Sequence, residues 1–271
     1  MRDTPSHRVA GELDAYFDAA PRPDADPVET GAFTLFVSRT PWNYYARPSL
    51  AHAEPISPAD LDQLAKACIE HNVDLAIEWV HEVHPELADL AAAFGLKVST
   101  YDLMVAAASN VAAPEVGDVR LRVVDADDPA LFSGRAVADV SFSFGGTATG
   151  SAGPTERDAV VRELSADLVD HLRDRDRRGL TITAVAESEA GVVAVGYYQP
   201  VGQTAEVVGV ATLPEARRRG LAGAVTALLV RHAREHGVRN ILLSAQDDDV
   251  ARVYERVGFR RVGSTHAAER P

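Results

Sequence analysis

The sequence predicts an α/β protein of two tandem domains, each with a mixed, mostly antiparallel sheet flanked by helices. Three observations carry this prediction: the 271 residues exceed one typical domain, strand and helix patterns alternate along the chain, and one helix–strand–helix–strand arrangement occurs twice. Residues 110–118 contain Ala, Pro and Gly between two apolar strands, as linkers do. We therefore place an N-terminal domain at residues 1–112 and a C-terminal domain at residues 113–271.

The C-terminal domain is expected to follow the order β-α-α-β-β-β-α-β-α-β. Thr155 is expected to cap a helix that runs to about Arg175, after a Gly-, Ser- and Thr-rich loop at residues 142–153. A hairpin around residues 188–191 follows. The other expected elements are strands at 119–124, 206–212, 241–245 and 259–264 and helices around 128–140, from 221 and at 250–257.

The N-terminal domain repeats the second half of that order. It has helix 61–70, strand 75–80, helix 85–94 and strand 97–105. The spacing from Asn72 to Gly95 exceeds that from Gly237 to Gly258 by two residues. Two copies of this size indicate duplicated folds and not a solenoid.

Composition and charge exclude several classes of protein. The hydrophobic fraction of 46% and charged fraction of 25% are ordinary for a globular protein, and the net charge of −13 opposes general binding to nucleic acid or anionic membranes. No apolar run approaches membrane-spanning length, and the N-terminus lacks the apolar region of a signal peptide, so we expect a cytoplasmic protein. The single cysteine, Cys68, is expected to fill core space. Two lysines against abundant arginine suggest a GC-rich, bacterial genome.

Residues 207–227 predict a phosphate site at a helix N-terminus. A β-branched strand ends at Pro214, three arginines and small residues follow, and apolar residues then recur at helical spacing up to Gly237. Small residues let backbone N–H groups approach an anion, and the helix dipole and arginines add positive potential. The chain lacks both a Gly-x-Gly-x-x-Gly turn after a strand and a Gly-Lys-Ser/Thr loop, so dinucleotide and P-loop folds are unsupported.

Arg217, Gly220 and Ala222 resemble the Gln/Arg-x-x-Gly-x-Gly/Ala signature of the GCN5-related N-acetyltransferase (GNAT) superfamily. The pattern of Ala251, Tyr254 and Gly258-Phe259 resembles the closing helix and strand of that family. The N-terminal copy lacks the signature: its first helix begins after Ser57-Pro58, and Ala91 stands in the place of Tyr254. We therefore interpret it as a degenerate copy that packs against the active domain or completes its acceptor cleft.

The resemblance implies an acyl-CoA-dependent N-acyltransferase that transfers acetyl from acetyl-CoA to a primary amine of a small molecule or peptide. It places the coenzyme A pyrophosphate on the turn and the pantetheine arm along the preceding strand, with a backbone N–H near Val210 polarising the thioester carbonyl. The implied cofactor-binding residues are Val208, Val210, Thr212, Arg217, Arg218, Arg219, Gly220, Leu221, Ala222 and Gly223.

Tyr254 matches the family's proton donor to the departing thiolate, and its alternative is a packed tyrosine with a wet hydroxyl. Glu206 stands where relatives carry a catalytic glutamate, and its alternative is a solvent-facing carboxylate on an edge strand. Acceptor specificity is expected from residues 142–146 and 197–199, with Phe142, Phe144 and Tyr198 as the named candidates. Residues 41–45 of the first domain are also expected to reach the cleft. For the aromatic residues of this expected acceptor site, the alternative is ordinary packing without a role in binding.

Other polar residues are given structural roles. His81 and His84 lack a strict ligand pattern, so no metal site is predicted, and Asp247–Asp249 are expected to cap a helix. His232 and His236 are expected at the surface of the motif helix. Asp247 departs from the family's usual asparagine, which puts one contact to the cofactor arm in doubt.

Two rival functions are kept. A coenzyme A-binding sensor or interaction module would keep the phosphate turn without turnover. A two-domain acetyltransferase of actinobacterial thiol synthesis shares the tandem layout, but no diagnostic acceptor motif is present. The expected assembly is a monomer or homodimer.

Overall fold

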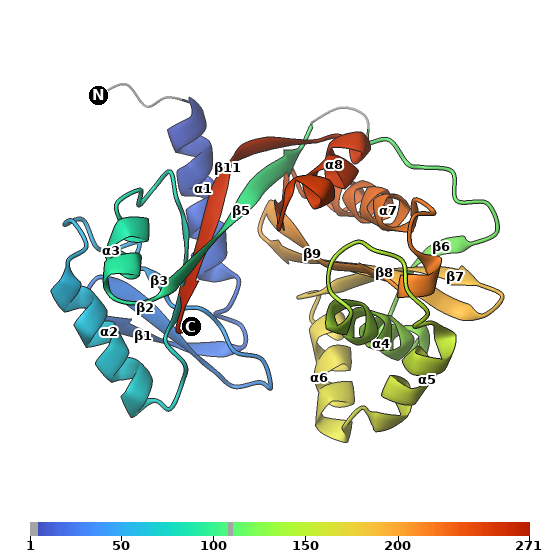
Figure 1. Ribbon diagram of the computed structural model, residues 1–271, viewed down its shortest axis with the longest axis horizontal. Helices are drawn as coiled ribbons and strands as arrows, with labels where there is room; N and C mark the ends of the chain where they lie inside the picture. Colours follow the sequence, from blue (N-terminus) through green and yellow to red (C-terminus); the bar gives the residue numbers. More distant parts are fainter. Residues whose placement is uncertain (1–4, 108–110) are drawn as a thin grey trace. The chain divides into compact units, whose positions relative to one another are not determined.

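The computed structural model describes residues 5–107 and 111–271, with side chains from Ala10 onward in the first helix. The chain divides into two compact units: the first joins Met1–Leu103 with Val262–Pro271, and the second is Met104–Arg261 (Figure 1). The last ten residues therefore group with the first unit. Asn110, where the predicted linker begins, lies outside the described residues, and the boundary at residue 112 stays a prediction.

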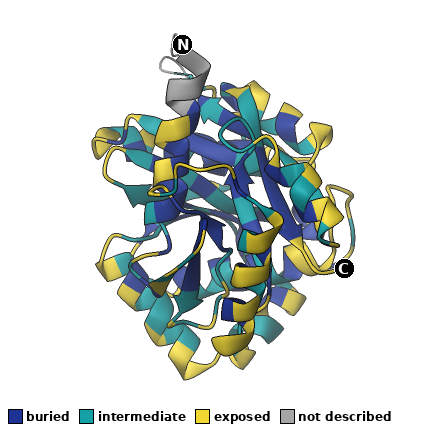
Figure 2. Cartoon of the chain, turned by 90° about the vertical axis from the view of Figure 1, so that its left-hand side faces the viewer, coloured by how far each residue is buried: buried dark blue, intermediate teal, exposed yellow. Residues whose placement is uncertain are grey.

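The first unit carries a three-stranded antiparallel sheet and the strands β4, β11 and β5, which are hydrogen-bonded neighbours in that order. β4 (Ala76–Val80) pairs antiparallel with β11 (Phe259–Glu269), from Val80 opposite Thr265 to Ala76 opposite Glu269. The remaining elements are α1 (Pro5–Ala19), β1 (Ala25–Thr30), β2 (Phe33–Ser38), β3 (Arg47–Pro48), α2 (Pro58–Glu70), α3 (Leu87–Ala93) and β5 (Lys97–Ala106), of which β1, β2 and β3 form the small sheet. In Figure 2, buried residues gather in the strands and exposed residues in the loops and on the outer faces of helices.

Helix α2 begins and ends as its sequence predicts. Ser57 is the N-cap, and its N–H donates to the Asp60 carboxylate at 2.9 Å. Asn72, after the helix, has φ +53°, and the N–H of Val73 donates to the Cys68 carbonyl at 2.9 Å. The apolar stripe of this helix is buried, and Cys68 lies within it.

The second unit has the predicted order of elements, with one helix divided in two. Strands β10, β9, β8, β7 and β6 lie in that order; all neighbours are antiparallel except β10 and β9, which are parallel. The bounds are β6 (Arg120–Val124), α4 (Ala130–Ser143), α5 (Pro154–Glu163), α6 (Ala166–Arg177), β7 (Ile182–Ser188), β8 (Gly191–Val201), β9 (Thr204–Thr212), a 3-10 turn (Pro214–Ala216), α7 (Leu221–Glu235), β10 (Asn240–Ala245) and α8 (Asp248–Val257).

The single helix expected from Thr155 to about Arg175 is wrong. Leu164 is extended at φ −60° and ψ 127°, and the Ser165 hydroxyl accepts the N–H of Leu168 at 3.2 Å, so a second helix starts there. The first of the two helices is capped at Gly153, whose N–H donates to the Glu156 carboxylate at 2.7 Å. A serine that caps a new helix therefore overrides the helical periodicity.

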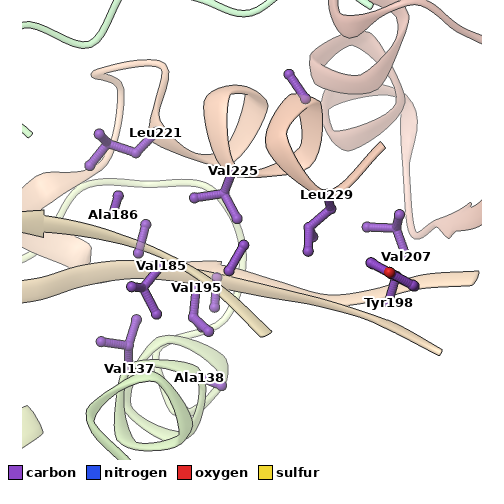
Figure 3. Packing of buried hydrophobic residues seen from close by; sticks show 14 of the residues in the cluster. Val137, Ala138, Val185, Ala186, Val195, Tyr198, Val207, Leu221, Val225 and Leu229 are labelled. Atoms are coloured by element: carbon purple, nitrogen blue, oxygen red, sulfur yellow. The ribbon is translucent and has the colours of Figure 1, made fainter. Parts of the chain in front are cut away.

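The sheet of the second unit is covered on both faces, by α4 on one and α7 on the other (Figure 3). Val185 and Val195 face α4: a Cβ added to Gly134 of α4 would lie 2.9 Å from Val195 Cγ2. Gly196, the next residue, faces α7, because a Cβ there would lie 3.0 Å from both Leu229 Cδ1 and Val225 Cγ1. Adjacent residues of a strand point to opposite faces of the sheet, and directly paired residues of neighbouring strands point to the same face. The two contacts therefore show which face each paired residue of β8 and β9 is on.

Candidate active site

The turn before α7 presents backbone N–H groups at a helix N-terminus. Gly220 is the N-cap, with φ +79°. The first N–H to bond within the helix is that of Ala224, which donates to the Gly220 carbonyl at 3.0 Å. The N–H groups of residues 221–223 precede that bond and have no acceptor within the helix, which is the arrangement that binds anions.

Two of the three arginines remain exposed beside this turn. Arg218 and Arg219 are exposed, and an Arg219 Nη2 lies 3.7 Å from the Asp118 carboxylate. Arg218 has φ +63°, a left-handed conformation that is rare outside glycine. Both guanidinium groups are therefore in a position to add positive charge near the helix N-terminus.

The Arg217 side chain is held by carbonyls of the protein itself. Its guanidinium donates to four carbonyls: Thr212 at 3.2 Å, Ser141 at 2.9 Å, Gly145 at 3.1 Å and Ala148 at 2.8 Å. Burial lowers its pKa. The fork of donors is thus used to hold the loop after α4, and no pattern in the sequence signals contacts across some seventy residues.

Gly223 is needed for packing as well as for any anion. A Cβ at this position would lie 3.2 Å from Pro114 Cγ and 3.4 Å from Val257 Cγ2. Gly220 lies near the same proline, since a Cβ there would be 3.3 Å from Pro114 Cβ. The small residues of the turn therefore let residue 114 approach the first turn of α7.

Strand β9 contains a bulge where the pantetheine arm is expected. Val208 pairs with Tyr197 and Ala211 with Val195, so two residues, Gly209 and Val210, stand opposite Gly196 alone. An extra residue of this kind leaves backbone groups outside the ladder. On the other side of β9, the positions paired with β10 run from Thr204 to Glu206. Half-buried Val208, Val210 and Thr212 follow that ladder, and the Thr212 hydroxyl is buried without a hydrogen-bond partner among the described residues.

Glu206 lies in the interior of the sheet. It is opposite Gln199 of β8 and Leu242 of β10, so the edge-strand alternative is wrong. Its neighbour Val207 pairs with Tyr198 and faces α7 in Figure 3, which directs Glu206 and Val208 toward the face that α4 covers. Glu206 is half-buried there.

Tyr254 lies on α8, and the centre of its ring is 6.0 Å from that of Phe259. Burial raises the pKa of the phenol to about 12. The helix is held at its start by Asp247, whose carboxylate accepts the N–H of Val250 at 2.9 Å, as the cap prediction required. A phenol with this pKa stays protonated throughout the physiological range.

Of the three residues expected to line the acceptor site, two are at the surface and one is not. Phe142 and Phe144 are 61% and 56% exposed, although Phe142 belongs to the last turn of α4 and not to the loop. Tyr198 is 2% exposed and packs toward α7, so its assignment to an open cleft is wrong. Its hydroxyl is 3.0 Å from His232 Nδ1, which gives that histidine a structural contact that the sequence did not suggest.

Tyr197, and not Tyr198, faces the same side as Glu206. It pairs with Val208, and a Cβ on Gly209 would lie 2.7 Å from its ring. Its hydroxyl is buried without a hydrogen-bond partner among the described residues. Burial raises its pKa, the charge of Arg135 lowers it and that of Asp139 raises it. Buried polar atoms in proteins normally have a hydrogen-bond partner, so this hydroxyl is an exception among the described residues.

The described residues hold no cluster of three or more His, Cys, Asp or Glu side chains that fits a metal ion. His81 instead stacks on His266 with ring centres 4.5 Å apart, and His84 lies 4.0 Å from the Glu86 carboxylate. None of the described helices is both long and apolar enough to span a membrane.

The sequence and the fold were compared with those of known proteins. Residues 152–259 match the model of the acetyltransferase (GNAT) family. The chain is similar to a solved GCN5-related N-acetyltransferase from Kribbella flavida, with 20% identity, a TM-score of 0.73, and 97% of this chain and 96% of that chain covered.

Two further solved structures are similar over most of the chain. One is a tandem GNAT protein from the clavulanic acid biosynthesis pathway, with 15% identity and a TM-score of 0.57. The match covers 89% of this chain and 79% of that chain. The other is a GCN5-related N-acetyltransferase-like protein from Streptococcus suis, with 14% identity, a TM-score of 0.55 and 97% of both chains covered. At these identities the likeness establishes the fold. Comparison with curated proteins gave no match.

Proposed function

We propose that the chain acetylates a primary amine of a small molecule or peptide by direct attack. The proposal is supported by residues 152–259, which match the model of the acetyltransferase (GNAT) family. The observation that carries the proposal is the bulged strand β9, which leads directly into a helix N-terminus with exposed arginines. We further propose residues 113–271 as the catalytic domain and residues 1–112 as a degenerate copy.

The donor that fits this arrangement is acetyl-CoA, which supplies an activated acetyl thioester. Its anionic pyrophosphate suits the N–H groups of residues 221–223 and the guanidinium groups of Arg218 and Arg219. Its extended arm suits the backbone of Val208–Thr212, where the bulge frees hydrogen-bonding groups. A freed N–H near Val210 would polarise a carbonyl placed beside it. Arg217 acts by holding the loop after α4.

Glu206 is the proposed base. An alkyl ammonium must lose a proton before its nitrogen can attack, and Glu206 is a half-buried carboxylate on the α4 side of the sheet. Tyr197 faces the same side and is proposed to orient the amine, because its buried hydroxyl has no hydrogen-bond partner among the residues that the structure describes. The exposed rings of Phe142 and Phe144 supply apolar surface at the end of α4.

Tyr254 is the proposed acid for the departing thiolate. Its phenol remains protonated because burial raises its pKa to about 12. The raised pKa makes the phenol a weaker acid than free tyrosine, so its contribution is a hydrogen bond that strengthens as the negative charge develops on sulfur.

Calorimetry and a thiol-release assay test the proposal together. We expect acetyl-CoA to bind with a stoichiometry of one per chain, to stabilise the protein by about 2.7 kcal/mol at a hundredfold excess over its Kd, and to release coenzyme A only when a primary amine is present. NAD and ATP serve as controls that should not stabilise the protein. Binding without turnover across an amine panel would favour the rival sensor function, and absence of binding would refute both.

A further inference from the structure

The first unit contains a pocket of about 180 Å³ that is separate from the residues of the proposed active site. It lies between the end of β2, the segment at residues 43–45 and the start of β4, with the end of β11 completing the wall. The lining residues on which the argument rests are Phe36, Tyr44, Tyr45, Asp74 and Glu269. All of them belong to the first compact unit.

Hydrogen bonds of the backbone and of one side chain hold the walls of the pocket in place. The Ala46 N–H donates to the Ala76 carbonyl at 2.8 Å, and the Ala46 carbonyl accepts the N–H of Glu78 at 2.9 Å. The Ser38 hydroxyl donates to the Thr40 carbonyl at 3.1 Å, which fixes the other end of the segment that carries the tyrosines. Glu269 stands opposite Ala76 in the β4–β11 ladder. The pocket is therefore a built feature of this unit.

Three aromatic residues contribute to the lining: Phe36, Tyr44 and Tyr45. The faces of such rings carry negative potential and attract organic cations, which is how quaternary ammonium groups are recognised in proteins. Phe36 is already used in this way within the chain, since the guanidinium carbon of Arg22 lies 5.7 Å from its ring centre.

The charged groups that line the pocket are both acidic: Asp74 and Glu269. Both are exposed. Burial raises the pKa of Tyr45, and the charges of Glu269 and Glu78 raise it further while Arg47 opposes them, so the carboxylates act on that ring.

The cations nearby are largely committed. Arg47 pairs with Glu78, Arg22 lies 2.8 Å from Asp18, and Arg39 pairs with Asp26. Arg270 follows Glu269 in the sequence and adds one positive charge beside that acid, whereas the lining itself contains two acids and no Lys, Arg or His. The balance opposes anionic ligands and favours positive ones.

We propose that this pocket is a second, non-catalytic binding site for an organic ammonium ion, held between the aromatic rings and the carboxylates of Asp74 and Glu269. The site is independent of acetyl transfer, because a quaternary ammonium bears no N–H to be acylated. It would give the degenerate copy a ligand of its own.

Choline and its uncharged carbon analogue 3,3-dimethylbutan-1-ol are the probes, measured by calorimetry and saturation-transfer NMR on the full chain. We expect choline to bind at least tenfold more tightly than the analogue, because the two share shape and differ in charge. Equal affinity of the two probes, or no choline binding at any soluble concentration, would overturn the proposal.

A matched pair of double variants locates the binding. Asp74→Asn with Glu269→Gln removes two charges from the pocket, whereas Glu54→Gln with Asp62→Asn removes two from exposed residues elsewhere in the same unit. We expect the first pair to weaken choline at least tenfold and the second to change it by less than twofold. Equal losses in both pairs would assign the effect to net charge and refute the site. Tyr45→Leu, which keeps every charge, should weaken choline at least threefold, and unchanged binding would likewise count against the site.

Discussion

The guanidinium of Arg217 binds backbone carbonyls of the protein, whereas Arg218 and Arg219 are exposed. Its guanidinium makes a planar fork that reaches four carbonyls, three of them in or next to the loop after α4. We expect Arg217→Lys to raise the KM for the amine about tenfold, because one ammonium cannot replace a fork of donors, and to leave the Kd for acetyl-CoA within about twofold. Steady-state kinetics and calorimetry separate the two constants.

Arg219→Lys is the matched control for this variant, because it retains the charge beside the turn. It should leave the amine KM unchanged. A large loss of acetyl-CoA affinity in Arg217→Lys, with normal amine KM, would return Arg217 to the phosphate site.

Tyr254 gives a prediction at the scale of one hydroxyl. We expect Tyr254→Phe to lower kcat about a hundredfold with an unchanged Kd for acetyl-CoA, as loss of a proton donor commonly does. Because burial raises the pKa of Tyr254 to about 12, the ratio of wild-type to variant kcat should stay constant from pH 7 to about 10. A ratio that falls near pH 10 would mean that the phenol ionises at its ordinary pKa.

At the scale of elements, β9 is shaped by its bulge. Gly209 has φ +61°, and a Cβ would lie 2.7 Å from the Tyr197 ring. Gly202, at the preceding hairpin, has φ +58° and no atom within 4 Å of such a Cβ. We expect Gly202→Ala to cost about 1 kcal/mol of unfolding free energy for its backbone alone, and Gly209→Ala to cost about 1–3 kcal/mol more for the clash. Urea titrations of both variants measure the difference in unfolding free energy. Equal losses of unfolding free energy would show that the Tyr197 ring moves aside without an energetic cost.

The same bulge explains which parts of the site could be read from sequence. Helix α7 was predictable, because Leu221, Val225 and Leu229 recur at helical spacing and Gly237 ends the helix with φ +85°. Which of Tyr197 and Tyr198 faces the α4 side could not be predicted from the sequence. It depends on how β8 pairs with β9, and the bulge at Gly209 shifts that register.

Other differences have the same origin in tertiary contacts. The four carbonyls that Arg217 binds are brought to it by folding, and no local spacing announces them. The division of the expected helix at Leu164 depends on which of two competing local signals, apolar periodicity or the Ser165 cap, is satisfied by the rest of the structure.

At the scale of the whole molecule, stability should depend on pH through a buried acid of α1. Burial raises the pKa of Asp14 to about 6, against an opposing charge from Arg47. The folded state therefore holds this proton more tightly than the unfolded state, so the group stabilises the protein at low pH and loses that contribution as pH rises through about 6.

Asp14→Asn tests this linkage. We expect the variant to be more stable than the wild type at pH 7.5, by up to about 3 kcal/mol for two pKa units, with a difference that shrinks as pH falls toward 4. Urea unfolding at several pH values measures it. A constant difference across that range would mean that Asp14 does not titrate there.

At Arg218, the stability of the fold and the affinity for acetyl-CoA are expected to have opposite requirements. Arg218 has φ +63°, a conformation that glycine adopts without steric cost and that arginine adopts only with strain. Replacing Arg218 by glycine should leave the melting temperature equal or higher and weaken acetyl-CoA, whereas Arg219→Gly, outside the left-handed region, should lower both. A laboratory selection for heat resistance alone would then be expected to discard Arg218 early and to produce sturdier, poorer enzymes.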